Sequence, residues 1–426
     1  MRILVYSLNF APELVGIGKY NADFANWLTK QGHEVQVICA PPYYPTWSVY
    51  PGYKSEHYAK QRYRRTTVYR CPIWVPAKPT GLKRILHLLS FAISSLPVLL
   101  WRTLAWQPDV IFVLEPPIFC LPSALACASL FDSKVWLHVQ DLEIDAGFSL
   151  GLVPQSKWFQ KLVYGLEGWL LKRTSVISSI TDKMLNAIQK KGILPSKCVL
   201  FPNWIDTQAV RPLANSSVFR EELGIATKQT VCLYSGNLGN KQGLEILIES
   251  ARLLQSQSNI TFVIAGEGSM KEALIQLSSD LNNIVFLPLQ PTHRFNELLN
   301  LADIHLLPQS TEAADIVFPS KLKAIFASGR PVIATANAHT QLHDIVKGRG
   351  LVVPPGNLEA FSQAIQDLSL DSATRLRLGN AARNYAMAHW ERNNIMSNVE
   401  FRLLALLSPQ HLPIAQRRSL SQKSFS

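Results

Sequence analysis

Short apolar runs rich in β-branched residues alternate with helical patterns along most of this 426-residue chain. Runs that are apolar on both sides and separated by helices are typical of a parallel sheet covered on both faces. The strands predicted in the first half are 2–8, 34–40, 109–115, 134–141 and 175–180, and those in the second half are 230–236, 260–268, 283–289, 303–309, 331–336 and 350–355. We therefore expect an α/β fold of two facing, doubly wound domains, whose strand-end loops line a cleft suited to a two-substrate transferase.

The division between the two halves is indicated by a stretch rich in proline and polar residues, VLFPNWIDTQAVRPL, at 199–213. We expect an N-terminal domain at 1–205 and a C-terminal domain at 206–389. A helix at 390–408 is expected to cross back to the N-terminal domain. The last residues, 409–426, contain three basic and no acidic side chains and many serines, and are expected to be a disordered tail.

Composition and charge exclude several classes of protein. Hydrophobic residues make up 47% and charged residues 17%, which is not the composition of a disordered chain. Six cysteines without a C-x-x-C pair argue against a disulfide scaffold and against structural zinc of the usual spacing. The start, MRILVYSLNF, lacks the pattern of a signal peptide, so we expect a protein that faces the cytosol.

The net charge of +12 points to an acidic partner, and the basic residues are densest at 54–84. The only acid in this stretch is Glu56, and tyrosines and tryptophans are interleaved with its nine basic residues: Lys54, Lys60, Arg62, Arg64, Arg65, Arg70, Lys78, Lys83 and Arg84. Such interleaving is compatible with stacking on nucleic-acid bases, and a solvated loop is the ordinary alternative.

The segment that follows, 85–101, is a 17-residue run without Asp, Glu, Lys or Arg and is flanked by basic residues. It is shorter than the roughly 20 residues needed to span a bilayer. An apolar helix with basic ends suits the interface of an anionic leaflet, and a buried helix of the α/β domain is the alternative. We favour an anionic membrane surface as the partner, and we expect no nucleic acid.

Two glycine-containing loops follow predicted strands and precede helices, where backbone N–H groups can approach an anion closely. In the first, Gly16 and Gly18 do not form a dinucleotide fingerprint, because Asn21 stands where a third glycine is needed. The alternative is that these glycines only permit a tight turn. The second, SGNLGNKQG at 235–243, places Gly236, Asn237 and Lys241 where a diphosphate needs donors and a cation, without the Walker A pattern.

Two further groups of residues are candidates for chemistry. Ser320, Lys321 and Leu322 open a predicted helix, where Ser320 is a good N-cap and Lys321 is placed for a second phosphate or ribose contact. His138 ends a predicted strand and is a candidate to contact a substrate hydroxyl, although a lone histidine on a strand is more often structural. Asp141, close behind it, is a candidate base. No motif suited to a metal is found.

At these residues the sequence resembles the retaining, GT-B-fold glycosyltransferases of family 4. The matching pieces keep the family's order along nearly the whole chain: Ala11-Pro12-Glu13, Gly16-Ile17-Gly18, Gly32-His33-Glu34-Val35, Gln107-Pro108-Asp109-Val110, Pro202-Asn203 with Asp206, Gly236 with Lys241-Gln242-Gly243, Gly266-Glu267-Gly268 and Gly329-Arg330-Pro331-Val332. Within that family, HVQDLEIDAG, YSGNLGNKQGLE and the segment ending in FPSKL resemble fucosyltransferases of the colanic-acid type.

The resemblance implies two Rossmann-like domains, with a nucleotide-sugar donor held by 206–389 and an acceptor approached from 1–205. It implies that Lys241 stabilises the leaving diphosphate, that Gly16 and Gly18 let their loop approach the donor, and that His138 contacts the sugar or acceptor. Gly266 and Glu267 join the donor-binding set. No cofactor or metal is implied beyond the donor. The acceptor would be a lipid-linked saccharide at the cytoplasmic face of the inner membrane.

The chain departs from the family pattern at two carboxylates. Counting back from Gly329 places Ala324 and Ile316 where the family commonly has glutamates, the second of which usually binds the donor ribose. Asn237 stands where the family usually has arginine, and Ser320 and Lys321 are candidates to supply part of the missing contacts. A GDP-linked deoxyhexose such as fucose is the expected donor, with a UDP-sugar as the alternative. A catalytically impaired sugar-nucleotide-binding protein is the alternative of another class.

Overall fold

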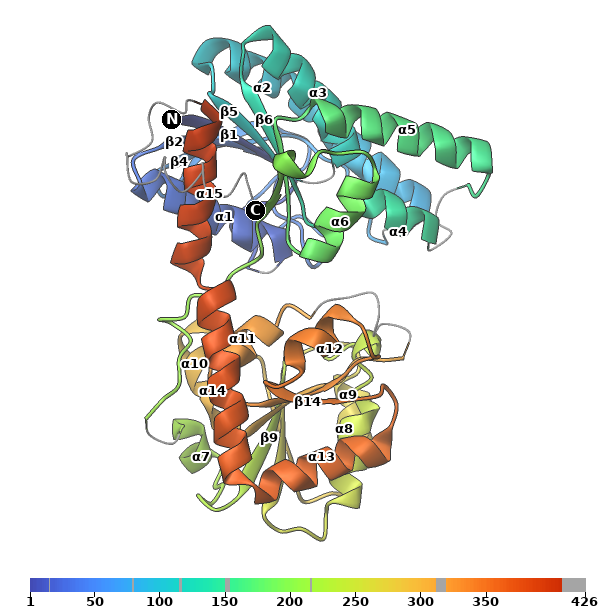
Figure 1. The fold of residues 1–426 in the computed structure, drawn as a ribbon, viewed down its shortest axis with the longest axis vertical. Coiled ribbons are helices and arrows are strands. Elements are labelled where there is room, and N and C mark those ends of the chain that lie inside the picture. Colours follow the sequence, from blue (N-terminus) through green and yellow to red (C-terminus); the bar gives the residue numbers. More distant parts are fainter. Residues whose placement is uncertain are drawn as a thin grey trace. The chain divides into compact units, whose positions relative to one another are not determined.

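The computed structural model describes residues 1–14, 16–78, 80–114, 117–149, 154–214, 217–311 and 319–407, without the side chains of 117, 118, 149 and 241. The described chain forms two compact units (Figure 1). Unit 1 comprises Met1–Asn203 together with the chain from Ile395 onward, and unit 2 comprises Trp204–Asn394. The predicted disordered tail, 409–426, lies outside the described residues.

Unit 1 is built on an eight-stranded sheet in the order β3-β4-β2-β1-β5-β6-β7-β8. All neighbouring strands are parallel except β3 and β4, which are antiparallel. The strands are β1 (Arg2–Ser7), β2 (Glu34–Cys39), β3 (Ala59–Tyr63), β4 (Thr66–Arg70), β5 (Val110–Leu114), β6 (Lys134–Val139), β7 (Val176–Ser179) and β8 (Cys198–Leu200). The strand order reverses direction between β1 and β5, and ligands of doubly wound sheets bind beyond the carboxyl ends of strands at such a point.

The helices of unit 1 connect these strands and cover the sheet (Figure 1). They are α1 (Gly16–Lys30), α2 (Gly81–Trp106), α3 (Pro117–Leu130), α4 (Glu143–Ser149), α5 (Lys157–Arg173) and α6 (Asp182–Lys190), with a 3₁₀ turn η1 at Pro195–Lys197. One core cluster contains apolar side chains of β1, β5 and β6 together with those of α2 and α3.

Unit 2 contains a six-stranded, wholly parallel sheet in the order β11-β10-β9-β12-β13-β14. The strands are β9 (Thr230–Ser235), β10 (Ile260–Ala265), β11 (Ile284–Leu287), β12 (Ile304–Leu307), β13 (Val332–Thr335) and β14 (Gly350–Val353). The helices are α7 (Val218–Glu222), α8 (Glu245–Leu253), α9 (Lys271–Leu277), α10 (Phe295–Leu301), α11 (Leu322–Ala327), α12 (Gln341–Val346), α13 (Leu358–Leu370) and α14 (Ser372–His389), with 3₁₀ turns η2 (Asn240–Gln242) and η3 (Thr292–Arg294). The direction of the strand order changes between β9 and β12.

The eleven strands expected from the sequence are all present, so the prediction of two parallel α/β sheets is confirmed. β3, β4 and β8 were not expected. β3 and β4 lie inside the basic stretch 54–84, where they form an antiparallel hairpin instead of a loop, with β3 at the edge of the sheet. β3 is the exposed edge strand, so it tolerates the basic residues that hide it in the sequence.

Arg70, at the end of β4, does not belong to the basic surface of this stretch. Its side chain is buried, and the guanidinium donates to the carbonyl oxygens of Ala40 and Ala11 and to Sγ of Cys39. It therefore ties the end of β4 to the segments that follow β2 and β1.

The apolar run 85–101 lies within α2, a 26-residue helix that packs beside α3 and against β2. Its length and composition alone are compatible with crossing a membrane. The residues facing unit 1 are His87, Leu88, Phe91, Ala92, Ser95, Leu99 and Thr103. The opposite face exposes large apolar side chains at helical spacing: Leu82, Leu86, Ile93, Leu96, Leu100 and Leu104. We call this second set the α2 stripe. One face of α2 therefore packs on unit 1, and the opposite, apolar face is exposed to water.

The last described helix, α15 (Arg392–Leu407), belongs to unit 1 from Ile395 onward. Its buried residues are Ile395, Met396, Val399 and Leu403. His33 Nε2 lies 2.8 Å from Glu400 Oε1, which joins this helix to the turn before β2. Unit 1 is therefore completed by residues from the far end of the chain.

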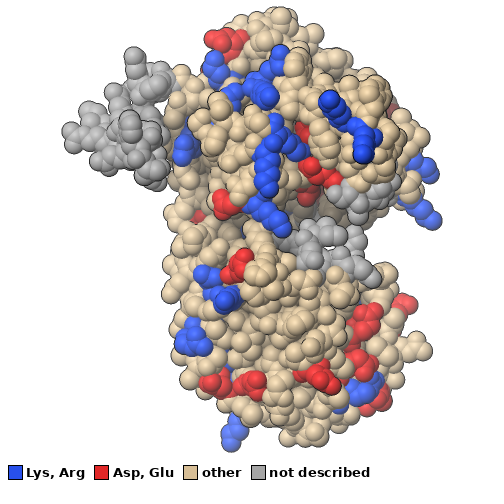
Figure 2. Space-filling view, turned by 45° about the vertical axis from the view of Figure 1, so that its right-hand side comes forward, with Lys and Arg blue, Asp and Glu red and all other residues tan. Residues whose placement is uncertain are grey.

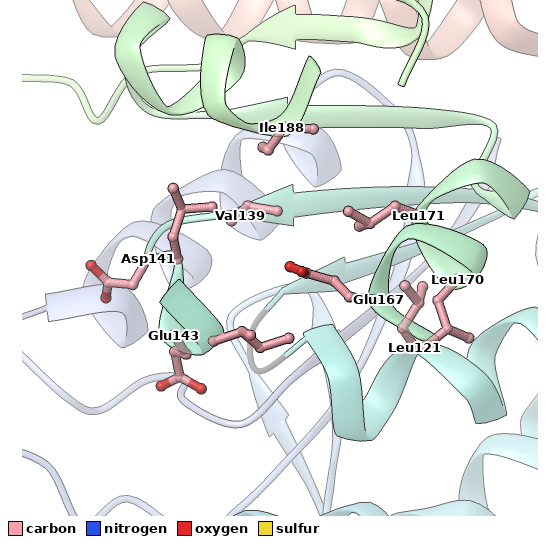
Figure 3. A pocket seen from close by; sticks show the side chains of 10 residues that line it. Leu121, Val139, Asp141, Glu143, Glu167, Leu170, Leu171 and Ile188 are labelled. Atoms are coloured by element: carbon pink, nitrogen blue, oxygen red, sulfur yellow. The ribbon is translucent and has the colours of Figure 1, made fainter. Parts of the chain in front are cut away.

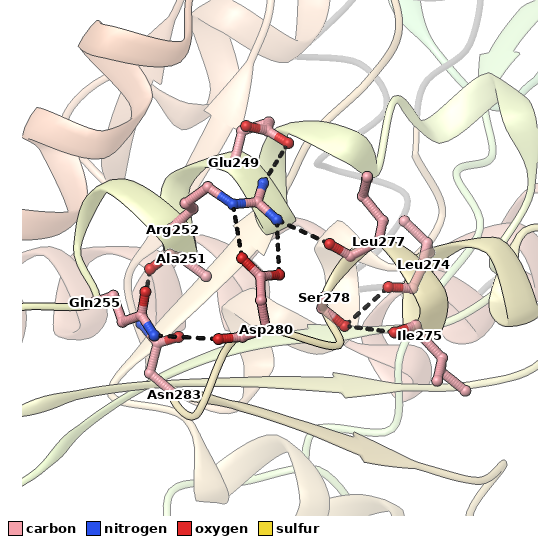
Figure 4. A network of polar contacts seen from close by, with 10 residues as sticks. All are labelled: Glu249, Ala251, Arg252, Gln255, Leu274, Ile275, Leu277, Ser278, Asp280 and Asn283. Carbon is pink, nitrogen blue, oxygen red and sulfur yellow. Dashed lines mark hydrogen bonds and ion pairs between the residues drawn. The ribbon is translucent and has the colours of Figure 1, made fainter.

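In unit 2, Arg252 at the end of α8 ties two neighbouring segments to its own helix (Figure 4). Its guanidinium pairs with Glu249 at 2.7 Å and with Asp280 at 3.0 Å, and donates to the carbonyl oxygen of Leu277 at 2.9 Å. Asn283 Nδ2, just before β11, donates to the carbonyl oxygen of Ala251 at 2.8 Å. These contacts fix the path from α9 to β11 on the amino side of the sheet.

Candidate functional site

The loops that follow β9 and β10 meet at the carboxyl edge of the unit 2 sheet, beside the reversal of its strand order. The N–H of Gly236 donates to the carbonyl oxygen of Ala265, and that of Leu238 to the carbonyl oxygen of Glu267, each at 2.9 Å. A Cβ on Gly266 would lie 1.9 Å from the carbonyl oxygen of Gly236. Only glycine permits this approach, so Gly236 and Gly266 are brought together by the fold.

Lys321, immediately before α11, reaches the same place from a distant part of the sequence. Its Nζ donates to the hydroxyl of Tyr234 at 2.7 Å and lies 4.0 Å from the centre of that ring. A Cβ on Gly236 would lie 2.6 Å from this Nζ, and Gly236 has φ +141°. Gly236 thus makes room for the ammonium group at the end of β9.

Burial determines the charge state at this edge. It lowers the pKa of Lys321 to about 8, and it raises that of the Tyr234 hydroxyl well above its usual range. The Tyr234 hydroxyl donates to the carbonyl oxygen of Asn237 at 2.6 Å, which holds the loop after β9 against the lysine. The result is a partly buried cation at the carboxyl edge of the sheet, an arrangement that favours an anion such as a diphosphate.

The other residues predicted to bind the donor in unit 2 differ from one another in burial and in their contacts. The main chain of Lys241 lies in η2 on this loop, while its side chain lies outside the description. Glu267 is half-exposed and pairs with Lys271 at 2.7 Å, which lowers its pKa. The prediction that Ser320 caps α11 was wrong, because the N-cap residue is Lys321 and it makes no side-chain cap bond. Leu322 has a fully buried side chain in the core of unit 2.

The structure describes only one of the two positions at which the family commonly has a glutamate. Ala324 is a buried residue of α11, so this helix position carries no carboxylate. Ile316 falls within 312–318, outside the described residues.

In unit 1 the loop after β1 is organised by Glu13. Its Oε1 accepts from the N–H groups of Tyr43 and Tyr44, each at 3.1 Å, and from Asn9 Nδ2 at 3.2 Å. Its Oε2 is buried without a hydrogen-bond partner, and burial raises the pKa of this carboxyl. A Cβ on Gly18 would lie 2.4 Å from Oε2, so glycine is required where α1 begins over this carboxylate.

Gly16 lies at the start of α1 with φ +65°, beside the ring of Tyr44. Gly16 and Gly18 were expected in the loop before a helix, but both lie in the first turn of α1, and Glu13 fixes the loop that precedes them to the segment after β2.

His138 lies near the end of β6 with its side chain inside unit 1. It is 2% exposed, its ring centre is 4.6 Å from that of Phe201, and its Nδ1 is hydrogen-bonded to Ser178 Oγ at 2.9 Å. Burial lowers the pKa of His138 to about 3, which keeps the ring neutral. Contact with a substrate stays a prediction, and the geometry gives the ring a packing role.

Asp141 follows β6 beside a small, mostly apolar pocket between β6, α3, α5 and α6 (Figure 3). Burial, reinforced by the neighbouring Glu143, raises the pKa of Asp141 to about 6. Glu143 in turn pairs with Arg84 of α2 at 2.5 Å. In Figure 3 the carboxylate of Glu167 points into the pocket, whereas those of Asp141 and Glu143 point away from it. Asp141 is thus a carboxylate able to exchange a proton near neutral pH.

Two residues that organise these loops were not singled out by the sequence. Tyr234 reads as one more apolar position of a buried strand, and Glu13 reads as part of a motif without a role. The available signal for Tyr234 was its polar tip near the end of a buried strand, since a buried tyrosine hydroxyl usually finds a partner. Within the described residues, no group of three or more His, Cys, Asp or Glu side chains is arranged to hold a metal ion.

Comparison with known proteins places these features in a family. Residues 215–385 match the family described as glycosyl transferases group 1, and residues 15–204 match the glycosyl transferase 4-like domain. The chain is 38% identical over 410 residues to WcaI of Escherichia coli K12, a protein assigned to colanic acid biosynthesis as a glycosyl transferase. That alignment covers 93% of this chain and 98% of WcaI.

Solved structures show the same fold at low sequence identity. Sucrose-phosphate synthase of Thermosynechococcus elongatus superposes with a TM-score of 0.71 at 16% identity, covering 96% of this chain and all of that one. Anabaena HepE, solved in complex with UDP, gives a TM-score of 0.66 at 16% identity, covering 95% of this chain and 100% of that one.

Proposed function

The chain belongs to the glycosyl transferases group 1 family, the retaining GT-B enzymes of family 4, and on that premise we propose a more specific reaction. It transfers a deoxyhexose, fucose or a close relative, from a GDP donor onto a lipid-linked saccharide in exopolysaccharide biosynthesis. The observation that carries the role in exopolysaccharide biosynthesis is the 38% identity to WcaI over nearly the full length of both chains, and the donor is inferred from the resemblance to fucosyltransferases of the colanic-acid type. The donor is a co-substrate, and no metal is required.

The unit 2 edge supports a diphosphate donor. Lys321 supplies a cation beside the loop after β9, at the carboxyl ends of the strands, where doubly wound sheets bind nucleotides. In a retaining transfer the developing charge on the leaving diphosphate is stabilised by such a cation. Lys241, whose main chain lies in η2 on the same loop, is the second cation that we assign to this role.

Two alternatives to this function can be tested by experiment. A UDP-sugar is the alternative donor, since no base-specific contact distinguishes the two nucleotides in the described residues. A binding protein without turnover is the alternative of another class, motivated by Ala324 at the position where a ribose-binding glutamate is usual.

A panel of GDP- and UDP-sugars tested by thermal shift separates these possibilities. A ligand at 100 times its Kd stabilises the folded protein by about 2.7 kcal/mol, which is readily detected. A shift with GDP-fucose above all other sugars, followed by transfer to an extracted lipid-linked fraction, is expected. A larger shift with UDP-sugars would replace the donor, and a shift without turnover would favour the binding protein.

The α2 stripe supports a peripheral location on the cytoplasmic face of the inner membrane, where a lipid-linked acceptor resides. The exposed leucines and isoleucine lie on one face of α2, and Lys78 and Lys83 are exposed at its start. On the face presented in Figure 2, Lys and Arg side chains are spread over unit 1. An apolar stripe beside basic side chains is the pattern of a helix that lies in an anionic interface.

A further inference from the structure

Unit 1 carries an open groove on the flank of α2 that none of the features above uses. It encloses about 700 Å³, within the range of roughly 300–1,000 Å³ typical of ligand sites. Its walls come from the segment after β2, the segment after β4 and one side of α2: Trp47, Ser48, Val49, Ser55, Glu56, Pro72, Ile73, Trp74, Val75, Ala77, Ser90 and Ser94.

The wall that contains Trp74 is fixed to α2 through its main chain. The N–H of Trp74 donates to Ser90 Oγ at 3.0 Å, and His87 Nδ1 donates to the carbonyl oxygen of Trp74 at 2.6 Å. Ser94 Oγ donates to the carbonyl oxygen of Pro72 at 2.5 Å. The indole itself is 46% exposed, so the backbone is held while the flat apolar face of the side chain is left for a ligand.

The lining combines aromatic faces with hydroxyl and carboxylate groups. An indole face packs on the C–H face of a sugar ring, while Ser48, Ser55 and Glu56 offer hydrogen-bonding groups to sugar hydroxyls. Ser55 Oγ donates to Glu56 Oε1 at 2.7 Å, which holds the carboxylate at the groove. A lipid chain in the same groove would remove this charged carboxylate from water, which is unfavourable. The chemistry of the walls therefore favours a saccharide over a hydrocarbon chain.

The groove also lies at the carboxyl edge of the sheet, the edge at which doubly wound sheets bind ligands. Its walls follow the carboxyl ends of β2 and β4, the same edge as the loop of Gly16 and Gly18. A chain of contacts links the two places: His87 Nε2 is hydrogen-bonded to the Tyr43 hydroxyl at 3.0 Å, and the N–H of Tyr43 donates to Glu13 at 3.1 Å. The same helix that forms one wall carries the α2 stripe.

We propose that this groove binds the saccharide part of the lipid-linked acceptor, with Trp74 as the stacking platform and Glu56 as a hydrogen-bonding partner. The inference rests on the proposed function, in which the acceptor is a saccharide carried by a lipid.

Saturation-transfer NMR on the full-length chain tests this proposal, with methyl glycosides of hexose and 6-deoxyhexose disaccharides as probes. Trp74→Ala is expected to raise the Kd of the best disaccharide at least tenfold, and Glu56→Gln severalfold. Trp158→Ala, which removes an equally large exposed indole from α5, should leave the Kd unchanged. Circular dichroism confirms that each variant is folded.

Equal disaccharide affinity in the Trp74 and Trp158 variants overturns the proposal. So does a Trp74→Ala variant that loses binding to phosphatidylglycerol vesicles while keeping its disaccharide, because the groove would then hold lipid. Failure of the proposed function is recognised separately, by the absence of a thermal shift with any nucleotide sugar in a chain that still binds the disaccharide through Trp74.

Discussion

Lys321 places a titratable charge next to a glycine that cannot be enlarged. Its Nζ lies between the Tyr234 ring and the end of β9. A Cβ atom added to Gly236 would contact this Nζ. The charge was foreseeable from its position at the start of a predicted helix. Its contact with Tyr234 was not, because 87 residues separate the two and only the sheet order brings them together.

We expect Lys321→Gln to weaken binding of the nucleotide sugar at least tenfold, since charge-assisted hydrogen bonds contribute about 1.5–3 kcal/mol. Isothermal titration at pH 7 measures the change. Lys228→Gln, an exposed lysine before β9 at the opposite edge of the sheet, is the matched control and should bind normally. If Lys321→Ala leaves donor affinity intact while Lys241→Ala abolishes turnover, Lys321 does not supply the missing family contacts.

The same lysine predicts how donor binding depends on pH. Burial lowers its pKa from an ordinary 10.5 to about 8, so the charge is lost as the pH rises through about 8. Donor affinity should therefore fall between pH 7 and pH 9 in the natural chain. In Lys321→Gln this fall should disappear, and a fall of equal size in the variant would assign it to another group.

His138 gives unit 1 a pH-dependent stability. Its pKa is about 3 in the folded state against an ordinary 6.5, so the unfolded state binds more protons between these values and stability is lost as the pH falls from 6.5. The loss attributable to this ring is about 2 kcal/mol between pH 7 and pH 5. In urea titrations followed by tryptophan fluorescence, His138→Phe should reduce the acid-induced loss by that amount. An unchanged loss would show that the ring is already protonated or solvated.

At the scale of elements, the sequence was most informative about buried strands. A central parallel strand such as β5 or β10 is apolar on both faces and therefore visible as a continuous run. β3 was missed because it is an exposed edge strand without a run of apolar residues, and β4 was missed because it is a short strand, TTVYR, that begins with two polar residues and ends with a basic one.

The two interpretations offered for 85–101 described opposite faces of one element. α2 buries one side against unit 1 and exposes the other, which a count of apolar residues cannot separate. The groove on the flank of α2 could not be predicted, because it depends on contacts between 72–77 and α2 that no spacing in the sequence encodes.

The α2 stripe predicts binding to vesicles that contain anionic lipid. Leu96→Ser with Leu100→Ser should weaken partitioning by about 1 kcal/mol per leucine, roughly thirtyfold together, because each side chain is nearly half exposed. Co-sedimentation with phosphatidylglycerol vesicles measures this. Leu370→Ser with Leu376→Ser, two exposed leucines of unit 2, should have no effect. Unchanged partitioning of the α2 variant would remove the helix from any membrane contact.

At the scale of the whole molecule, unit 1 is discontinuous in sequence. A chain that ends at Asn394 lacks the four buried residues of α15 and the Glu400 partner of His33. We expect it to lose several kcal/mol of unit 1 stability in urea titrations, because each large apolar side chain contributes about 1.5–3 kcal/mol when buried. Unit 2 retains all its residues, so the thermal shift with a nucleotide sugar should persist.

A chain that ends at Leu407 is the control for this truncation, since it keeps α15 and should match the full-length protein. Equal stability of the two truncated chains would mean that α15 contributes nothing to unit 1.

The position of α15 also decides when each half of the protein is finished during synthesis. A ribosome releases domains in order from the amino end, and domains generally fold as units in that order. Here unit 1 can be completed only after residues 395–407 have been synthesised, whereas the last residue of unit 2 is 394. The unit with the proposed donor site is therefore completed before the unit with the α2 stripe, and the newly made chain reaches its final form only after nearly all of it has left the ribosome.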